Sequence, residues 1–114
     1  MQVFQEKVRA SFVRRVRSYL REKRREWVAS LDDKGLDALI RSQVIAAESF
    51  GIATETGVVR FIEVGLALGE DFSTSGRFPE AERVLHHAGM NPEKKLQQLE
   101  EIAGKVVPKT AAQA

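Results

Sequence analysis

Apolar residues recur at helical spacing along almost the whole chain, and no stretch alternates as a β-strand does. Residues 3–30 contain no Gly or Pro and are rich in residues that favour helices. At 100° per residue, one side of this helix collects Val8, Phe12, Val16, Tyr19, Leu20, Trp27 and Leu31. The opposite side collects Lys7, Arg14, Arg17, Arg21 and Arg25. We therefore predict one long basic helix over residues 3–30.

A second helix is predicted over residues 35–50. Asp32 and Asp33 are suited to cap its start, and Lys34 and Gly35 fit a turn before it. Its apolar stripe consists of Leu36, Leu39, Ile40, Val44 and Ala47. Gly51 and Ile52 then fit the last two positions of a Schellman motif, which predicts the end of the helix.

A third helix is predicted over residues 55–68, with Thr54 or Thr56 as its cap. It has apolar residues most of the way round, so we expect it to be the central and most buried helix. These residues are Val58, Phe61, Ile62, Leu66 and Leu68. Gly65 weakens a helix interior, and its presence predicts a neighbouring helix in close approach.

Two shorter helices complete the predicted fold. Pro79 starts one over residues 79–88, with Ala81, Val84, Leu85 and Ala88 facing inward. Asn91 and Pro92 start another over residues 92–106, and residues 108–114 are expected to form a frayed tail. The prediction is an all-α fold: a single compact bundle of about five helices in one domain over residues 1–107, with a long basic N-terminal helix.

Charge is distributed unevenly along the 114 residues. Residues 1–30 carry nine Lys and Arg against three Glu, whereas residues 31–114 carry nine against thirteen Asp and Glu. A basic arm on an acidic body indicates an anionic partner, or a helix packed on its own acidic body. The charged N-terminal residues, with no long apolar run in the chain, lead us to expect a cytoplasmic protein that does not enter a membrane.

The chain offers little that suggests catalysis, a metal or a cofactor. It has no cysteine, and its glycines do not form a phosphate-binding motif. His86 and His87 are adjacent, so on a helix they point about 100° apart and do not chelate one ion. We expect one of them to be partly buried and the other exposed. The sequence thus predicts a protein that is not an enzyme and holds no metal or cofactor.

The basic helix suggests three kinds of partner. Nucleic acid is disfavoured because Tyr19 and Trp27 lie on the apolar side of the helix, away from any base. Membrane binding would take the apolar side away from the core. A protein partner conflicts with neither feature, because a long helix with arginine-rich surface can enter a groove or pair with its own copy.

A series of motifs occupies residues 36–102. They are Phe50-Gly51-Ile52, Thr54-Glu55, Val58, Arg60-Phe61-Ile62, Leu66 and Leu68-Gly69-Glu70-Asp71-Phe72, followed by Pro79 and Val84-Leu85. This series resembles small helical bacterial proteins that are often encoded beside type VI secretion spike proteins, toxic effectors and their loading chaperones. The chain has Ser73 to Gly76 where an aspartate-rich turn is common, and Pro79-Glu80 where Pro-Trp is common. The resemblance implies an adaptor or co-chaperone for an effector or its chaperone.

We therefore expect a protein-binding surface on the arginine side of the first helix, with a second candidate in the loop after residue 69. The candidate residues are Arg14, Arg17, Arg21, Arg24 and Arg25, and then Asp71, Phe72 and Phe78. Reversing Arg17, Arg21 and Arg25 to Glu should abolish partner capture and spare the fold. Three alternatives stay open: an immunity protein that occludes a co-encoded toxin, a homodimer through the first helix, and a small nucleic-acid-binding protein.

Overall fold

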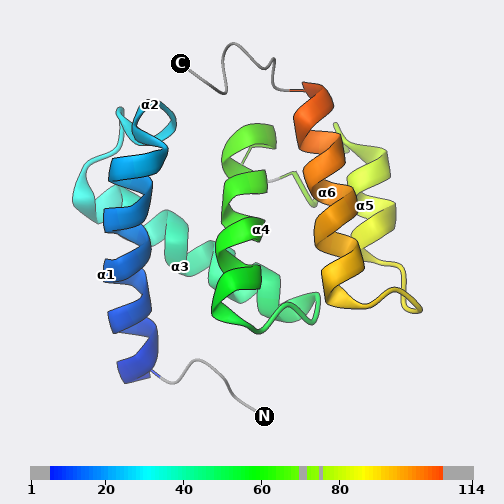
Figure 1. Cartoon of the computed structure of the whole chain (residues 1–114), viewed down its shortest axis with the longest axis horizontal. Helices are drawn as coiled ribbons and strands as arrows, with labels where there is room; N and C mark the ends of the chain where they lie inside the picture. The colour runs from blue at the N-terminus through cyan, green and yellow to red at the C-terminus, as the bar shows by residue number, and fades with distance from the viewer. Residues whose placement is uncertain (1–5, 70–71, 75, 107–114) are drawn as a thin grey trace.

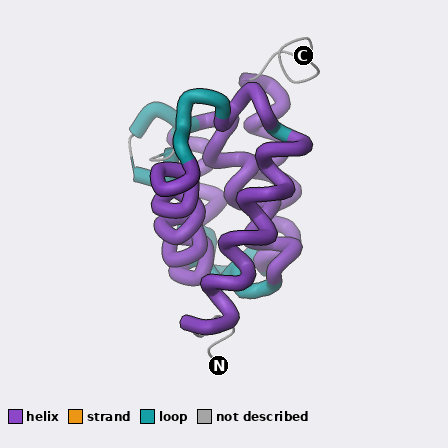
Figure 2. Tube along the Cα trace, turned by 90° about the vertical axis from the view of Figure 1, so that its left-hand side faces the viewer, coloured by secondary structure: helices purple, strands orange, loops and turns teal. Residues whose placement is uncertain are grey.

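The computed structural model describes residues 6–69, 72–74 and 76–106, with side chains from residue 10 to residue 105. Six helices and no strand occur in these ranges, so the predicted all-α class is confirmed (Figures 1 and 2). The helices are α1 (Glu6–Lys23), α2 (Arg25–Val28), α3 (Asp33–Ser49), α4 (Glu55–Leu68), α5 (Pro79–Leu85) and α6 (Pro92–Val106). The predicted helical residues 3–5 and the predicted tail 108–114 lie outside the described residues.

The helices pack as a row with one helix behind it. In Figure 1, α1, α4 and α6 run in the same direction, α5 returns beside α6, and α3 crosses behind α1 and α4. Both α1 and α4 pack on α3, and α4 also packs on α6. No helix in the described ranges has the length and apolar character needed to cross a bilayer.

The prediction of one uninterrupted helix over residues 3–30 is wrong at Arg24. There the backbone leaves the helical region, with φ −130° and ψ 39°, and α2 follows as a single turn. This change of direction buries Val28 completely and lays Trp27 against the core. The burial of these two side chains outweighs a helical propensity that no Gly or Pro interrupts.

The ends of α3 show why its boundaries are sharp. The Asp32 carboxylate accepts a hydrogen bond from the Gly35 N–H at 2.7 Å, so Lys34 and Gly35 lie in the first helical turn and not in a turn before it. At the other end, Gly51 has φ +83°. Its N–H bonds to the Glu48 carbonyl, and the Ile52 N–H bonds to the Ala47 carbonyl. These two bonds form the expected Schellman motif.

Helix α4 is the central helix of the fold, as its apolar sequence indicates. Thr54 caps it by accepting a hydrogen bond from the Gly57 N–H at 3.0 Å. Seven of its residues are buried: Gly57, Val58, Phe61, Ile62, Val64, Gly65 and Leu68. A Cβ atom at Gly65 would lie 3.0 Å from the Gln43 side-chain oxygen, so α3 makes the close approach that this glycine predicts.

Helices α5 and α6 form the other end of the row. Pro92 is the first residue of α6, and Asn91 caps it through a 2.8 Å hydrogen bond from the Lys94 N–H. Helix α5 ends at Leu85 and not at residue 88, and Ala88 is exposed. The His87 ring accepts a hydrogen bond from the Gly89 N–H at 3.1 Å, which favours a turn at this point.

Candidate functional site

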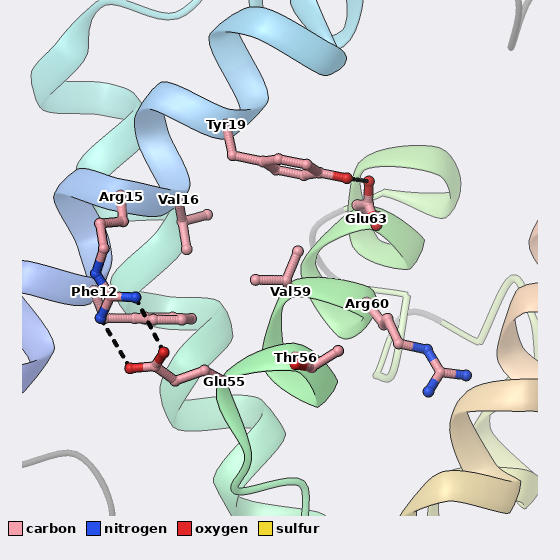
Figure 3. Close-up of a pocket in the computed structure, with 9 residues that line it drawn as sticks. All are labelled: Phe12, Arg15, Val16, Tyr19, Glu55, Thr56, Val59, Arg60 and Glu63. Carbon is pink, nitrogen blue, oxygen red and sulfur yellow. Dashed lines mark hydrogen bonds and ion pairs between the residues drawn. The ribbon is translucent and has the colours of Figure 1, made fainter.

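A groove of about 420 Å³ lies between α1 and α4, on the face that α3 leaves open (Figure 3). The apolar part of its surface comes from side chains on the facing sides of the two helices: Phe12, Val16 and Tyr19 of α1 and Val59 of α4. Phe12 and Val16 are buried, whereas Val59 and Tyr19 are partly exposed. The groove therefore has a fixed apolar floor and a more accessible upper edge.

An ion pair closes one end of the groove. The two terminal nitrogens of Arg15 donate to the two carboxylate oxygens of Glu55 at 3.0 and 2.9 Å. These hydrogen bonds lower the pKa of Glu55 and raise the pKa of Arg15. Both side chains remain in contact with water, with 55% and 44% of their surfaces exposed. Because exposed ion pairs contribute little net stability, this end of the groove opens at low cost.

Tyr19 spans the other end of the groove. Its ring extends from α1 toward α4, and its hydroxyl donates to the Glu63 carboxylate at 2.8 Å (Figure 3). Burial is the main cause that raises the pKa of Tyr19, and the hydrogen bond to Glu63 adds to it. Arg24 lies 3.0 Å from the same carboxylate and stacks its guanidinium over Trp27, at 5.4 Å from the ring centroid. Glu63 of α4 thus contacts α1 through Tyr19 and the junction between α1 and α2 through Arg24.

Arg60 lies on the α4 side of the groove but turns away from it, toward α6 (Figure 3). It donates to Glu93 at 2.8 Å and to both carboxylate oxygens of Glu100 at 2.9 and 2.8 Å. This arrangement raises the pKa of Arg60 and lowers the pKa of Glu93. Arg60 therefore ties the back of the groove wall to the neighbouring helix.

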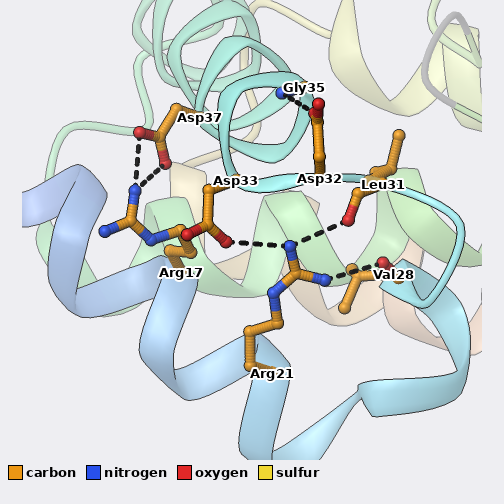
Figure 4. Close-up of polar contacts among 8 residues, drawn as sticks. All are labelled: Arg17, Arg21, Val28, Leu31, Asp32, Asp33, Gly35 and Asp37. Carbon is orange, nitrogen blue, oxygen red and sulfur yellow. Dashed lines mark hydrogen bonds and ion pairs between the residues drawn. The ribbon is translucent and has the colours of Figure 1, made fainter.

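Two of the predicted binding arginines hold the fold together (Figure 4). One terminal nitrogen of Arg17 donates to both carboxylate oxygens of Asp37, at 2.9 and 2.7 Å. Arg21 reaches the loop after α2 and donates to the carbonyls of Val28 and Leu31, at 3.0 and 2.8 Å, and to Asp33 at 3.0 Å. Replacing both with Glu would place carboxylates beside these carboxylate and carbonyl oxygens. The charge reversal is therefore expected to destabilise the fold at these two positions and not to spare it.

The other predicted arginines differ in their surroundings. Arg14 and Arg25 are exposed. Arg24 is half-buried at the Trp27 ring and beside Glu63. The structure therefore does not bring the five arginines together as one open face: among them only Arg14 and Arg25 are exposed, and Arg25 lies beyond the break at Arg24.

The second predicted surface is divided between core and loop. Phe72 is fully buried, with its ring centroid 5.4 Å from that of Phe61, so it serves the core and not the surface. Phe78 is partly buried, and the Arg77 guanidinium lies over its ring at 5.5 Å. Asp71 lies outside the described residues.

The two histidines directly follow α5. His86 and His87 are both exposed, so the expectation that one is partly buried is wrong. His86 packs edge-on against Phe50, with ring centroids 5.4 Å apart. Among the side chains that the structure describes, no group of three or more His, Cys, Asp or Glu could hold a metal ion.

Sequence reasoning did not identify the groove, although it placed several of its residues on helix faces. Tyr19 lies at the edge of the apolar side of α1, and Val59 lies at the edge of the buried side of α4. A helix that is apolar most of the way round, as α4 is, offers more apolar surface than two neighbours can cover. This excess of apolar residues on α4 is the feature of the sequence that could have indicated a further, partly open contact of this helix.

Comparison with family models, with curated proteins and with solved structures finds no match for this chain.

Proposed function

We propose that this protein is a protein-binding module, acting as an adaptor or co-chaperone, and that the groove between α1 and α4 receives its partner. The observation that supports this proposal is the lining of the groove. It combines an apolar floor at Phe12 and Val16 with a partly exposed edge at Tyr19 and Val59. Recognition of a helix in a groove uses this combination, because the accessible edge at Tyr19 and Val59 supplies apolar surface to bury and the charged ends supply orientation.

The polar side chains of the groove favour binding over reaction. Arg15 and Glu55 are engaged with each other, as are Tyr19 and Glu63. These contacts shape the ends of the groove and set its charge. The resemblance of residues 36–102 to proteins encoded beside type VI secretion genes supports an effector, or its loading chaperone, as the partner.

Two matched variants test the role of the groove. Val59→Arg fills the groove at its partly exposed edge, and Ile102→Arg places the same side chain at a half-buried site between α5 and α6. Each tagged variant would be expressed in the native host, and the captured partner would be identified and the complex reassembled from purified proteins. We expect Val59→Arg to lose the partner and Ile102→Arg to keep it, with the circular dichroism of both unchanged.

Retention of the partner by Val59→Arg would place the interface elsewhere. A toxin as the identified partner, with protection of cells that express it, would assign the immunity role in place of the adaptor role.

A further inference from the structure

The break at Arg24 interrupts a stretch of sequence that favours a continuous helix. Residues 20–26 are Leu, Arg, Glu and Lys alone, all of them strong helix formers. Gly and Pro, the usual residues at such breaks, do not occur in residues 3–30. The Trp27 N–H bonds to the Arg24 carbonyl at 3.0 Å, whereas a continuous helix would use the carbonyl of Lys23. Straightening the chain at Arg24 would therefore restore helical hydrogen bonds in a segment whose residues favour them.

Helix α1 does not leave its place at this hinge unless something replaces it, because its inner face is part of the core. Phe12, Val13, Val16 and Leu20 have at most 2% of their surface exposed. This face packs on α3, which follows the break in the chain (Figure 1). If α1 swung away, its apolar face and the surface that it covers would both meet water. An α1 from a second copy of the chain carries the identical face and would restore the burial.

Polar contacts of α1 likewise cross the break. Arg17 is bound to Asp37 of α3, and Tyr19 is bound to Glu63 of α4. Every copy of the chain has both members of each pair, so each contact can form equally well between two chains. The chain has no cysteine, so no disulfide ties α1 to its own body. The contacts that hold α1 therefore do not specify which copy supplies it.

We infer that this chain forms a dimer by exchanging α1, so that the surface under α1 receives the same helix from a second copy. Each chain straightens at Arg24, α1 and α2 become one helix, and α1 of one copy packs on α3 of the other. The exchange keeps the contacts of the single chain and changes only the hinge, which is why swapped dimers form at low cost. The groove then has its α1 wall and its α4 wall from different chains. This inference goes beyond the proposed function and does not depend on it.

A matched pair of variants at the hinge tests the straightening. Arg24→Ala and Arg24→Gly both remove the ion pair with Glu63 and the stacking on Trp27, so they differ only in the backbone preference at the hinge. Alanine favours a helix much more than glycine does. Because a swapped dimer contains two hinges, the Kd for dimerisation should be at least about tenfold lower in Arg24→Ala than in Arg24→Gly. Analytical ultracentrifugation of each variant, refolded from urea at several concentrations, measures both constants.

A cross-link shows which copy supplies α1. One variant carries Arg15→Cys and another carries Glu55→Cys, so each chain has a single thiol. Arg15 and Glu55 are in contact in the structure and both are accessible to a reagent. The two variants are unfolded in urea, refolded together at high concentration and treated with a short bismaleimide. We expect mass spectrometry to find a covalent dimer with one chain of each kind, and much less of it when Arg83→Cys, on α5, takes the place of Arg15→Cys.

Two results overturn the inference in the hinge variants: an Arg24→Ala chain that stays monomeric at every concentration, or equal dimerisation of Arg24→Ala and Arg24→Gly. The cross-linked chains keep Arg24, so that experiment decides the matter even if the hinge variants fail to fold. A dimer without the mixed cross-link would mean that two intact folds associate through their outer surfaces, which also overturns the exchange. Val59→Arg alters the groove and not the hinge, so loss of the natural partner by that variant would still support the proposed function.

Discussion

Lys95 of α6 donates from its ammonium group to the main-chain carbonyl of Leu85, at 2.9 Å, at the end of α5. The same ammonium reaches the carbonyl of Phe50, at 3.4 Å, at the end of α3. The last carbonyls of a helix lack partners within it and carry partial negative charge. One buried cation therefore completes two helix ends and fastens three helices to one another.

Replacing this lysine tests the contact. Lys95→Met keeps the length of the side chain but leaves two helix-end carbonyls without their donor. We expect the free energy of unfolding in urea to fall by about 1–3 kcal/mol. Lys94→Met, one position earlier and exposed, is the control and should change it by less than about 0.5 kcal/mol. Equal losses in the two variants would refute the role given to Lys95.

Gly51 and Gly104 should respond to alanine with opposite signs. Gly51 has φ +83°, a conformation that residues with a side chain rarely adopt. A Cβ there would meet only Pro92, at 3.9 Å, so the cost of alanine comes from the backbone conformation and not from a clash. Gly51→Ala should destabilise the fold by about 1 kcal/mol. Gly104 lies in α6 with nothing within 4 Å of a Cβ, and Gly104→Ala should stabilise it by about 0.5–1 kcal/mol. Urea unfolding measures both, and a shared sign would contradict the argument.

These glycines also show which parts of the fold could be predicted. The end of α3 at Gly51 and the caps at Thr54 and Asn91 depend on a few neighbouring residues, so the sequence alone indicates them. The break at Arg24 does not, because it depends on the burial of Val28 against distant residues. The groove was missed for the same reason: it exists where two helices that pack on α3 face each other, and local sequence does not contain that spacing.

Arg21 should matter to the fold, although it was predicted to bind a partner. Arg21→Met removes the donors to the Val28 and Leu31 carbonyls and should cost about 1–2 kcal/mol in urea unfolding. Trp27 is the single tryptophan, so its fluorescence reports this turn directly and should shift to longer wavelength. Arg21→Lys should recover little, because one ammonium does not reproduce a guanidinium that reaches several acceptors.

Arg25→Met is the matched control for this turn. Arg25 is exposed in α2, two residues before Trp27, and its loss should change neither stability nor fluorescence. A fluorescence shift in Arg25→Met equal to that in Arg21→Met would show that charge near Trp27, and not the carbonyl contacts, holds the turn.

Arg60 makes part of the stability depend on pH. Its hydrogen bond holds the pKa of Glu93 below the usual value, so the ionised carboxylate favours the folded state. This contribution is present above the pKa of the unfolded chain, near about 4.3, and is lost as pH falls through the lowered pKa. Arg60→Met should therefore be less stable than the wild type at pH 7, with the difference narrowing toward pH 3.

Urea unfolding across this pH range measures the effect, and Arg83→Met serves as the control that removes an exposed arginine elsewhere. A constant difference between Arg60→Met and the wild type at all pH values would mean that packing of the arginine stem, and not its charge, stabilises α4 against α6.

Tyr19 offers a direct probe of the groove because it is the single tyrosine of the chain. Burial and the Glu63 carboxylate favour the protonated phenol, so its pKa lies above the ordinary value of 10.0. Glu63→Gln removes the negative charge and should move the pKa down toward that value. Arg24→Met should move it up, because the guanidinium favours the phenolate. Ultraviolet absorbance during alkaline titration measures each shift.

The two variants are expected to shift the pKa of Tyr19 in opposite directions, which distinguishes the effect of the two charges from a change in the burial of the ring. If both variants shifted the pKa in the same direction, a change in the exposure of the ring would explain the result better than the two charges.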